Sequence, residues 1–142
     1  MTFIYPYPRP AVTVDALVFA PAGHEWFILL VQRGKEPFQC LWALPGGFMD
    51  LQETLLEACM RELQEETGLV IEKMEPFRVY DALDRDPRHR TISVVFSAYL
   101  PEIVPVRGDD DASRAEWFRI DQLPELAFDH TEIVSQFLKL YF

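Results

Sequence analysis

One stretch of the chain, residues 47–69, constrains its fold more than any other. Thr54 is followed three residues later by Glu57, the spacing of a capping box at a helix start. Gly68 stands where the left-handed residue after a helix end is expected. The sequence therefore predicts a helix that begins at Thr54, ends at Gly68 and contains no proline. Its predicted buried stripe consists of Leu56, Met60 and Leu63.

Three carboxylates share another face of the predicted helix. Glu62, Glu65 and Glu66 are spaced i, i+3 and i+4, so they lie within one turn. Like charges at this spacing destabilise a helix by about 0.2–0.5 kcal/mol per pair. Two interpretations follow: a solvated acidic face, or a site for a hard divalent cation that prefers oxygen ligands. The spacing alone favours the solvated face, whereas the surrounding pattern favours the cation site.

That pattern is Gly-x5-Glu-x7-Arg-Glu-Leu-x-Glu-Glu-x-Gly-Leu, beginning at Gly47 and ending at Leu69. It resembles the Nudix box, and every defining position is filled. The match is specific because nine positions, occupied by only four residue types, are filled at fixed offsets. The resemblance implies an α/β sandwich of the Nudix α/β/α type, with a mixed sheet and the catalytic helix after a Gly-Gly loop. It also implies Mg²⁺- or Mn²⁺-dependent hydrolysis of a nucleoside diphosphate linked to another group.

The resemblance assigns expected roles by position. Glu53 is a metal ligand or a supporting carboxylate, and Arg61 orients the glutamates by ion pairing. General-base candidates are Glu53, Glu66 and an acidic residue of the 109–111 loop, represented by Asp111. Gln52, where relatives often carry glycine, is a local departure. The expected metal ligands are a backbone carbonyl of Gly46 or Gly47 and the carboxylates of Glu62, Glu65 and Glu66.

Composition narrows the class of function. The formal net charge of −10 argues against a general nucleic-acid or membrane-surface binder. It is compatible with a phosphate substrate, because bound metal ions invert the local field. Cys40 and Cys59 have no metal-ligand spacing and are interpreted as buried or incidental thiols in a reducing compartment. With no signal peptide or membrane-spanning run, we expect one cytoplasmic domain, residues 1–142.

Apolar periodicity predicts the remaining elements. Residues 11–20 and 26–33 are expected to form a hairpin, and residues 131–140 a closing amphipathic helix. Residues 101–106 are read as a connection or weak strand, and residues 121–125 as a turn or short helix. Further strands are expected at residues 70–71, 77–82, 91–100 and 115–120.

The 84–90 loop carries Arg85, Arg88 and Arg90. It is either a solvated hairpin tip or a set of guanidinium groups for phosphate, to which arginine's planar fork is suited. Clustered cations in an acidic chain favour phosphate binding. Phe38 is a candidate for stacking on adenine, as are the arm residues Tyr5 and Tyr7, although aromatic residues usually belong to the core. The proline-rich arm, residues 5–10, is interpreted as an extended segment for base stacking, a subunit interface or a clamp on the core.

Segments outside the box look like the ADP-ribose pyrophosphatase branch of the family. The resemblance implies a small-molecule nucleotide substrate, ADP-ribose, cleaved to AMP and ribose 5-phosphate, with no nucleic acid or membrane partner. Relatives are commonly homodimers. The alternatives are a pyrophosphatase for modified nucleoside triphosphates, an ADP-ribose sensor without catalysis and a purely structural acidic helix. The segments that carry this resemblance are residues 42–48, 84–88, 108–118 and 126–130.

Overall fold

The computed structural model describes residues 2–107 and 112–142, and within them seven strands form one mixed sheet. Strand β1, Ala11–Ala22, pairs in parallel with β6, Thr91–Tyr99, and antiparallel with β2, Glu25–Arg33. β4 also pairs with β1, β5 with β6, and both β3 and β7 with β2. The bounds of these shorter strands are Trp42–Ala43 (β3), Gly46–Phe48 (β4), Glu75–Tyr80 (β5) and Ala112–Arg119 (β7).

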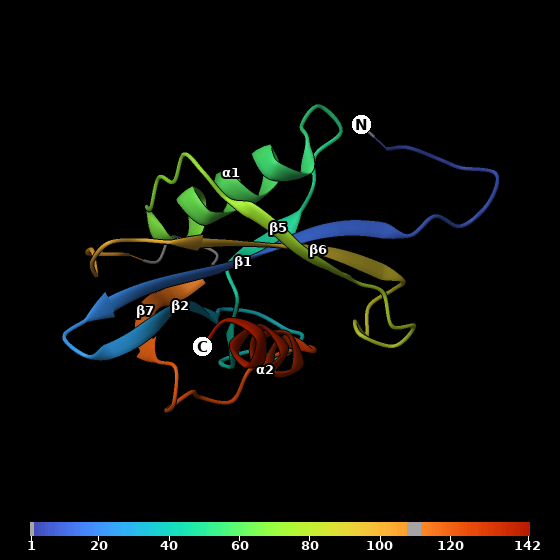
Figure 1. Cartoon of the computed structure of the whole chain (residues 1–142). Coiled ribbons are helices and arrows are strands. Elements are labelled where there is room, and N and C mark those ends of the chain that lie inside the picture. The colour runs from blue at the N-terminus through green and yellow to red at the C-terminus, as the bar shows by residue number, and fades with distance from the viewer. Residues whose placement is uncertain (1, 108–111) are drawn as a thin grey trace.

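Helices α1, Leu55–Thr67, and α2, His130–Tyr141, cover opposite faces of the sheet (Figure 1). Successive side chains of β1 point to opposite faces, so one strand supplies both cores. The predicted α/β/α sandwich with a mixed sheet is confirmed. The α1 side of β1 carries Val14, Ala16 and Val18, and the α2 side carries Leu17 and Phe19.

Helix α1 has the predicted ends. Thr54 and Glu57 form a reciprocal capping box, and Gly68 has φ 78°. The predicted buried stripe is wrong in part: Leu63 is buried, but Leu56 is 36% exposed and Met60 is only half-buried. The first buried residue of α1 is Ala58, directly after the exposed Leu56 and Glu57. The buried face consists of Ala58, Cys59, Leu63 and Thr67.

Most of the predicted strands are present with shifted ends. The hairpin of β1 and β2 turns at Gly23, which has φ 63°. Residues 70–71 are not a strand, which corrects that prediction; they follow the left-handed end of α1 and lead into β5. Residues 101–106 form a connection without strand pairing, and residues 121–125 form a turn rather than a short helix.

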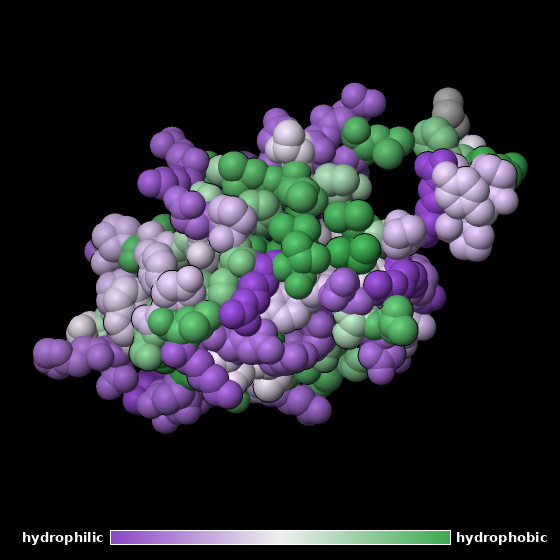
Figure 2. Space-filling view, turned by 45° about the vertical axis from the view of Figure 1, so that its right-hand side comes forward, coloured by the Kyte–Doolittle hydropathy of each residue, from purple (hydrophilic) through white to green (hydrophobic). Residues whose placement is uncertain are grey.

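The N-terminal arm, residues 2–10, is exposed throughout and stands away from the body (Figures 1 and 2). Its tyrosines stack on Arg9, whose guanidinium carbon lies 3.7 Å from the Tyr5 ring centre and 5.3 Å from that of Tyr7. The arm is therefore not a clamp on the core. Among residues 2–107 and 112–142, neither helix has the length and apolar character needed to cross a bilayer.

Candidate active site

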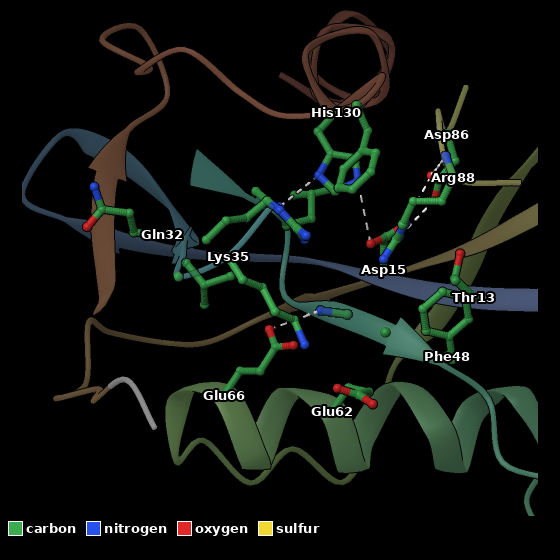
Figure 3. Close-up of a pocket in the computed structure, with 18 of the residues that line it drawn as sticks. Thr13, Asp15, Gln32, Lys35, Phe48, Glu62, Glu66, Asp86, Arg88 and His130 are labelled. Atoms are coloured by element: carbon green, nitrogen blue, oxygen red, sulfur yellow. Dashed lines mark hydrogen bonds and ion pairs between the residues drawn. The ribbon is translucent and has the colours of Figure 1, made fainter. Parts of the chain in front are cut away.

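A cavity of about 380 Å³ lies between α1, the β4 strand and the N-terminal end of α2 (Figure 3). Its volume is within the range of small-molecule sites, about 300–1,000 Å³. One wall is acidic and comes from α1. The facing wall is basic and aromatic, and comes from the ends of β2 and β4, the 85–88 loop and the turn before α2. The cavity thus brings both signs of charge together.

The acidic wall consists of Glu62 and Glu66. Glu66 Oε2 accepts the Gly46 N–H at 3.3 Å, which ties the carboxylate to the Gly-Gly turn. Burial raises the pKa of Glu66, and the adjacent negative charge of Glu62 raises it further. Burial likewise raises the pKa of Glu62, whose side chain is 15% exposed. Two buried carboxyl groups side by side are costly to ionise, because both burial and mutual repulsion disfavour the charged form. A bound cation would offset that cost.

Arg61 stands at the centre of the other carboxylates. Its guanidinium donates to Glu53 at 2.6 Å, to Glu62 at 2.9 Å and to Glu65 at 3.2 Å. It also donates to the Phe48 carbonyl at 3.1 Å, which links α1 to the end of β4. The hydrogen bonds from Arg61 to Glu53 are the main reason that the pKa of Glu53 is lowered to about 2. Arg61 therefore contacts three of the carboxylates of the box, and its role in orienting them stays a prediction.

The glycine pair lies against the carboxylates. A Cβ atom on Gly47 would lie 2.6 Å from the Glu62 carboxyl carbon, closer than real Cβ contacts. A Cβ on Gly46 would overlap the Val14 carbonyl oxygen and the Asp15 carboxylate. Glycine is needed at position 46 because β1 approaches so closely, and at position 47 because α1 does.

Cations and aromatic rings are interleaved on the opposite wall. The Arg88 guanidinium lies 5.2 Å from the Phe48 ring centre and 5.5 Å from that of Phe128. The Arg33 guanidinium lies 4.9 Å from the Phe128 ring centre. Burial lowers the pKa of Arg33, and the positive charge of Arg88 lowers it further. Two guanidinium groups that repel each other favour an anion between or beside them.

The structure separates the three arginines that the sequence grouped. Only Arg85 and Arg88 line the cavity, and Arg90 donates to the Ala82 carbonyl instead. The Arg85 side chain is 4% exposed and forms a two-armed pair with Asp129 at 2.7 and 3.0 Å. Interpreting Arg85 as a free phosphate ligand, or as part of a solvated tip, does not agree with this pairing. Asp86 and Arg88 are also paired, at 2.8 Å.

Two other candidates from the sequence lie at the margin of the cavity. Phe38 does not line it, but packs edge-on against Phe128 with ring centres 4.9 Å apart. Glu65 is 54% exposed and turned toward Arg61. Asp111 lies outside the described residues. Sequence reasoning missed five residues that line the cavity, Asp15, Arg33, Lys35, Phe128 and His130.

The signals for these missed residues are weak in one sequence. Asp15 interrupts an otherwise apolar strand pattern, which is a sign of a buried polar role, whereas His130 stands before the apolar helix pattern and carries no such sign. Phe128 has a left-handed backbone with φ 54°, which is costly for a non-glycine residue and concentrates at functional sites. Only coordinates reveal that conformation.

The donor atoms fit a hard divalent cation. Glutamate carboxylates and nearby carbonyls are the oxygen ligands that Mg²⁺ and Mn²⁺ prefer. Among the described residues, no three acidic, histidine or cysteine side chains already converge on one point. The reason is visible in the contacts: Glu62 and Glu65 turn toward Arg61, and Glu66 turns toward the Gly46 N–H. Arg61 supplies the positive charge beside Glu62 and Glu65.

The NUDIX domain family pattern matches residues 9–140 of this chain. The chain belongs to the Nudix family. It is 40% identical over 135 residues to the ADP-ribose pyrophosphatase of Methanocaldococcus jannaschii, covering 94% of this chain and 76% of that protein. Together, the family match and this relative identify the chain as a Nudix pyrophosphohydrolase. The predicted resemblance to the ADP-ribose pyrophosphatase branch is confirmed.

Two further comparisons concern a transcriptional repressor and a solved Nudix domain. The chain is 33% identical over 134 residues to the ADPR responsive transcriptional repressor NtrR of Acinetobacter baylyi, and spans 54% of that repressor's length. The Nudix domain of Shewanella oneidensis NrtR, solved in complex with ADP ribose, superposes with a TM-score of 0.90 at 29% identity. That match covers 98% of this chain and 94% of the solved one. The chain is therefore similar in sequence both to a pyrophosphatase and to a transcriptional repressor.

Proposed function

We propose that this Nudix hydrolase cleaves ADP-ribose to AMP and ribose 5-phosphate with Mg²⁺ or Mn²⁺. The observation that carries the proposal is the division of one cavity into an acidic wall, Glu62 and Glu66, and a basic wall, Arg33 and Arg88. A cation at the first wall and an anionic sugar phosphate near the second complement these charges. The 40% identity to an ADP-ribose pyrophosphatase supports the same substrate.

The residues that would hold the metal are Glu62, Glu65 and Glu66, with a backbone carbonyl of Gly46 or Gly47. When bound, a divalent cation neutralises charge on a diphosphate and acidifies the water in its hydration shell. The protein's own contribution is orientation. The Gly46 amide fixes Glu66, and the Arg61 guanidinium fixes Glu62 and Glu65.

A general base must accept a proton from the attacking water. Glu53 is poorly suited, because its two-armed pair with Arg61 lowers its pKa to about 2 and occupies both oxygens. Glu66 lies inside the cavity and, among the described residues, pairs with no cation and has the Gly46 N–H as its one backbone partner, so it is less fully engaged than Glu53. We therefore propose Glu66 rather than Glu53 as the base, with Asp111 as the remaining candidate.

The basic wall would bind the part of the substrate beyond the diphosphate. Arg88 is held by Asp86 on one side and by the rings of Phe48 and Phe128 on the others, so its guanidinium has few orientations to lose on binding. Preorganisation of this kind strengthens binding without new contacts. Lys35 adds a flexible positive charge at the same wall.

The test is hydrolysis of a substrate panel with Mg²⁺ or Mn²⁺, comparing kcat/KM for ADP-ribose, ADP-sugars, dinucleotides and nucleoside triphosphates. We expect ADP-ribose or a close ADP-sugar to rank first, with AMP among the products. A modified triphosphate in first place would instead indicate a nucleotide-sanitising enzyme. Tight ADP-ribose binding without AMP release would indicate a sensor, the function named for the repressor relative.

A further inference from the structure

Three polar side chains replace apolar ones in the core on the α2 side of the sheet. Asp15 precedes Leu17 and Phe19 on the same face of β1, and Ser93 precedes Val95 on the same face of β6. His130, the first residue of α2, is 4% exposed and lies beside them. Burying polar groups is costly unless each is hydrogen-bonded. Throughout the described residues, every buried side-chain nitrogen and oxygen has a partner.

These residues and their partners form a buried polar network, in which His130 and Asp15 lie side by side (Figure 3). The Leu44 N–H donates to His130 Nδ1 at 3.0 Å, so Nδ1 is an acceptor and the ring proton lies on Nε2. Nε2 lies 3.6 Å from Asp15 Oδ1. The Ser93 hydroxyl donates to the other oxygen of Asp15. The Leu44 hydrogen bond therefore fixes the ring tautomer of His130, and the Asp15 carboxylate faces Nε2 from just beyond hydrogen-bonding distance.

The far end of this network is the turn that carries the glycine pair. The amide of Leu44 goes to His130, Pro45 has no amide, and the amide of Gly46 goes to Glu66. The carbonyl of Pro45 accepts the Ala16 N–H at 2.8 Å. Both available amides of this turn thus donate to side chains. One side chain belongs to the buried network, and the other belongs to the acidic wall.

We infer that His130 is a positioning residue for hydrolysis, acting through the Leu44–Gly46 turn on the carboxylate of Glu66. The inference rests on the proposed function for its activity readout. His130 lies at the cavity boundary from the α2 side and Glu66 from the α1 side, and the turn between them is the shortest connection that the hydrogen bonds provide. An error in the turn would misplace the Gly46 amide and, with it, Glu66.

The test compares His130→Asn with His130→Leu and His130→Gln. The asparagine oxygen occupies nearly the same place as Nδ1 and accepts the Leu44 N–H, whereas leucine has no acceptor and glutamine places its acceptor near Nε2. We expect the Leu and Gln variants to lose about 10- to 100-fold in kcat and in Mn²⁺ affinity, the loss typical of groups that orient metal ligands. KM should change little, and Asn should restore most of both quantities.

The control for general destabilisation is Ile133→Ala, which removes a buried core side chain from the same helix without touching the turn. It should lower Tm yet leave kcat and Mn²⁺ affinity of the folded protein unchanged. Folded Leu and Gln variants with wild-type kcat and Mn²⁺ affinity would overturn the inference. If the Leu variant does not fold, the comparison of Asn with Gln decides.

Mn²⁺ affinity, measured by electron paramagnetic resonance, separates this inference from the proposed function. Wild-type protein that binds Mn²⁺ but does not release AMP from ADP-ribose would refute the substrate. The Mn²⁺ affinities of the variants would still decide the role of His130. Equal affinities in the wild type and the folded Gln variant would refute the positioning role, whatever the substrate.

Discussion

Arg61 and Glu53 form a two-armed ion pair, with Nη2 2.6 Å from Oε1 and Nε 2.9 Å from Oε2. Glu53 also accepts the Asp50 N–H at 2.9 Å, so the loop before α1 is bound to the helix through a single carboxylate. The same guanidinium reaches Glu62 and Glu65. Arg61 is therefore the residue on which the loop and the acidic face both depend.

Replacing Arg61 with alanine should destabilise the metal-free protein. The change leaves Glu53, Glu62 and Glu65 without their shared cation, and charged hydrogen bonds contribute about 1.5–3 kcal/mol each. Partial exposure of the guanidinium places the expected loss near the lower end. Urea unfolding with and without Mg²⁺ measures it. Added metal should narrow the difference from wild type; an identical loss in both conditions would count against a metal at these carboxylates.

Replacing Glu65 or Glu66 with glutamine should remove a proposed metal ligand. Loss of a group that only supports the ligands typically lowers activity about 10- to 100-fold, and we expect a larger decrease in kcat here. Thermal stability should stay the same or rise slightly without metal, since each change relieves like-charge repulsion on α1. The measurements are kcat and Tm. Exposed Glu72, outside the helix, is the matched control when changed to glutamine. Wild-type turnover in both site variants would refute the metal assignment.

The arginines of the 84–90 loop should separate in their effects. Arg88→Ala should raise KM more than it lowers kcat, because its guanidinium faces the cavity and would bind ground and transition states alike. Arg85→Ala should instead destabilise the fold by about 3–5 kcal/mol, since Asp129 would be left buried without its partner. Arg90→Ala, outside the cavity, is the control. Steady-state kinetics and urea unfolding distinguish them, and equal effects from all three would contradict this division.

Gly47→Ala should impair the site while preserving the fold. The added Cβ would lie 2.6 Å from the Glu62 carboxyl carbon, so that side chain must move. We expect weaker Mn²⁺ binding and lower kcat with nearly unchanged secondary structure by circular dichroism. A variant with wild-type Mn²⁺ affinity would show that the position of Glu62 does not matter for the metal.

Stability should depend on pH through His130. Burial lowers the pKa of this imidazole below the usual value of 6.5. Below pH 6.5 the unfolded chain therefore binds a proton that the folded protein does not. The free energy of unfolding consequently decreases as the pH is lowered, by at most about 1.4 kcal/mol per pH unit. Glu62 and Glu66, with raised pKa values, act in the opposite direction at lower pH.

The His130 contribution is isolated by difference. Urea unfolding of the wild type and of His130→Asn between pH 5 and 8 should show a gap that shrinks as the pH falls from 6.5. Above pH 6.5 the gap should be constant. A gap that stays the same from pH 8 to 5 would mean that His130 keeps its ordinary pKa in the folded state.

The sequence was sufficient to predict the helix that carries the glutamates, because residues next to each end determine where it begins and ends. Thr54, Glu57 and Gly68 each act within a few residues of their own position. The β-branched and apolar residues at 11–20 likewise predict a strand. In contrast, residues 70–71 are apolar and β-branched, yet they follow the helix end and pair with nothing, since propensity is overridden by context.

The cavity was less predictable because its walls come from distant parts of the chain. Arg33 is the last residue of β2, Phe128 precedes α2, and nothing in their local sequence indicates that they meet. The basic loop misled for a related reason. Arg85 is paired with Asp129, 44 positions later, and such a partner is invisible to any argument from neighbouring residues. Charge clusters in sequence therefore say where cations are, and not which of them are free.

The parallel pairing of β1 with β6 has a kinetic consequence. Residues 11 and 91 are partners in this ladder, and nine consecutive pairs keep that separation. The centre of the sheet therefore forms only after the chain closes a very long loop, which slows folding relative to helical proteins of the same size. Until it closes, the apolar strand at residues 11–22 is unpaired on its β6 side and able to associate with other chains. Refolding yield should consequently fall as protein concentration rises.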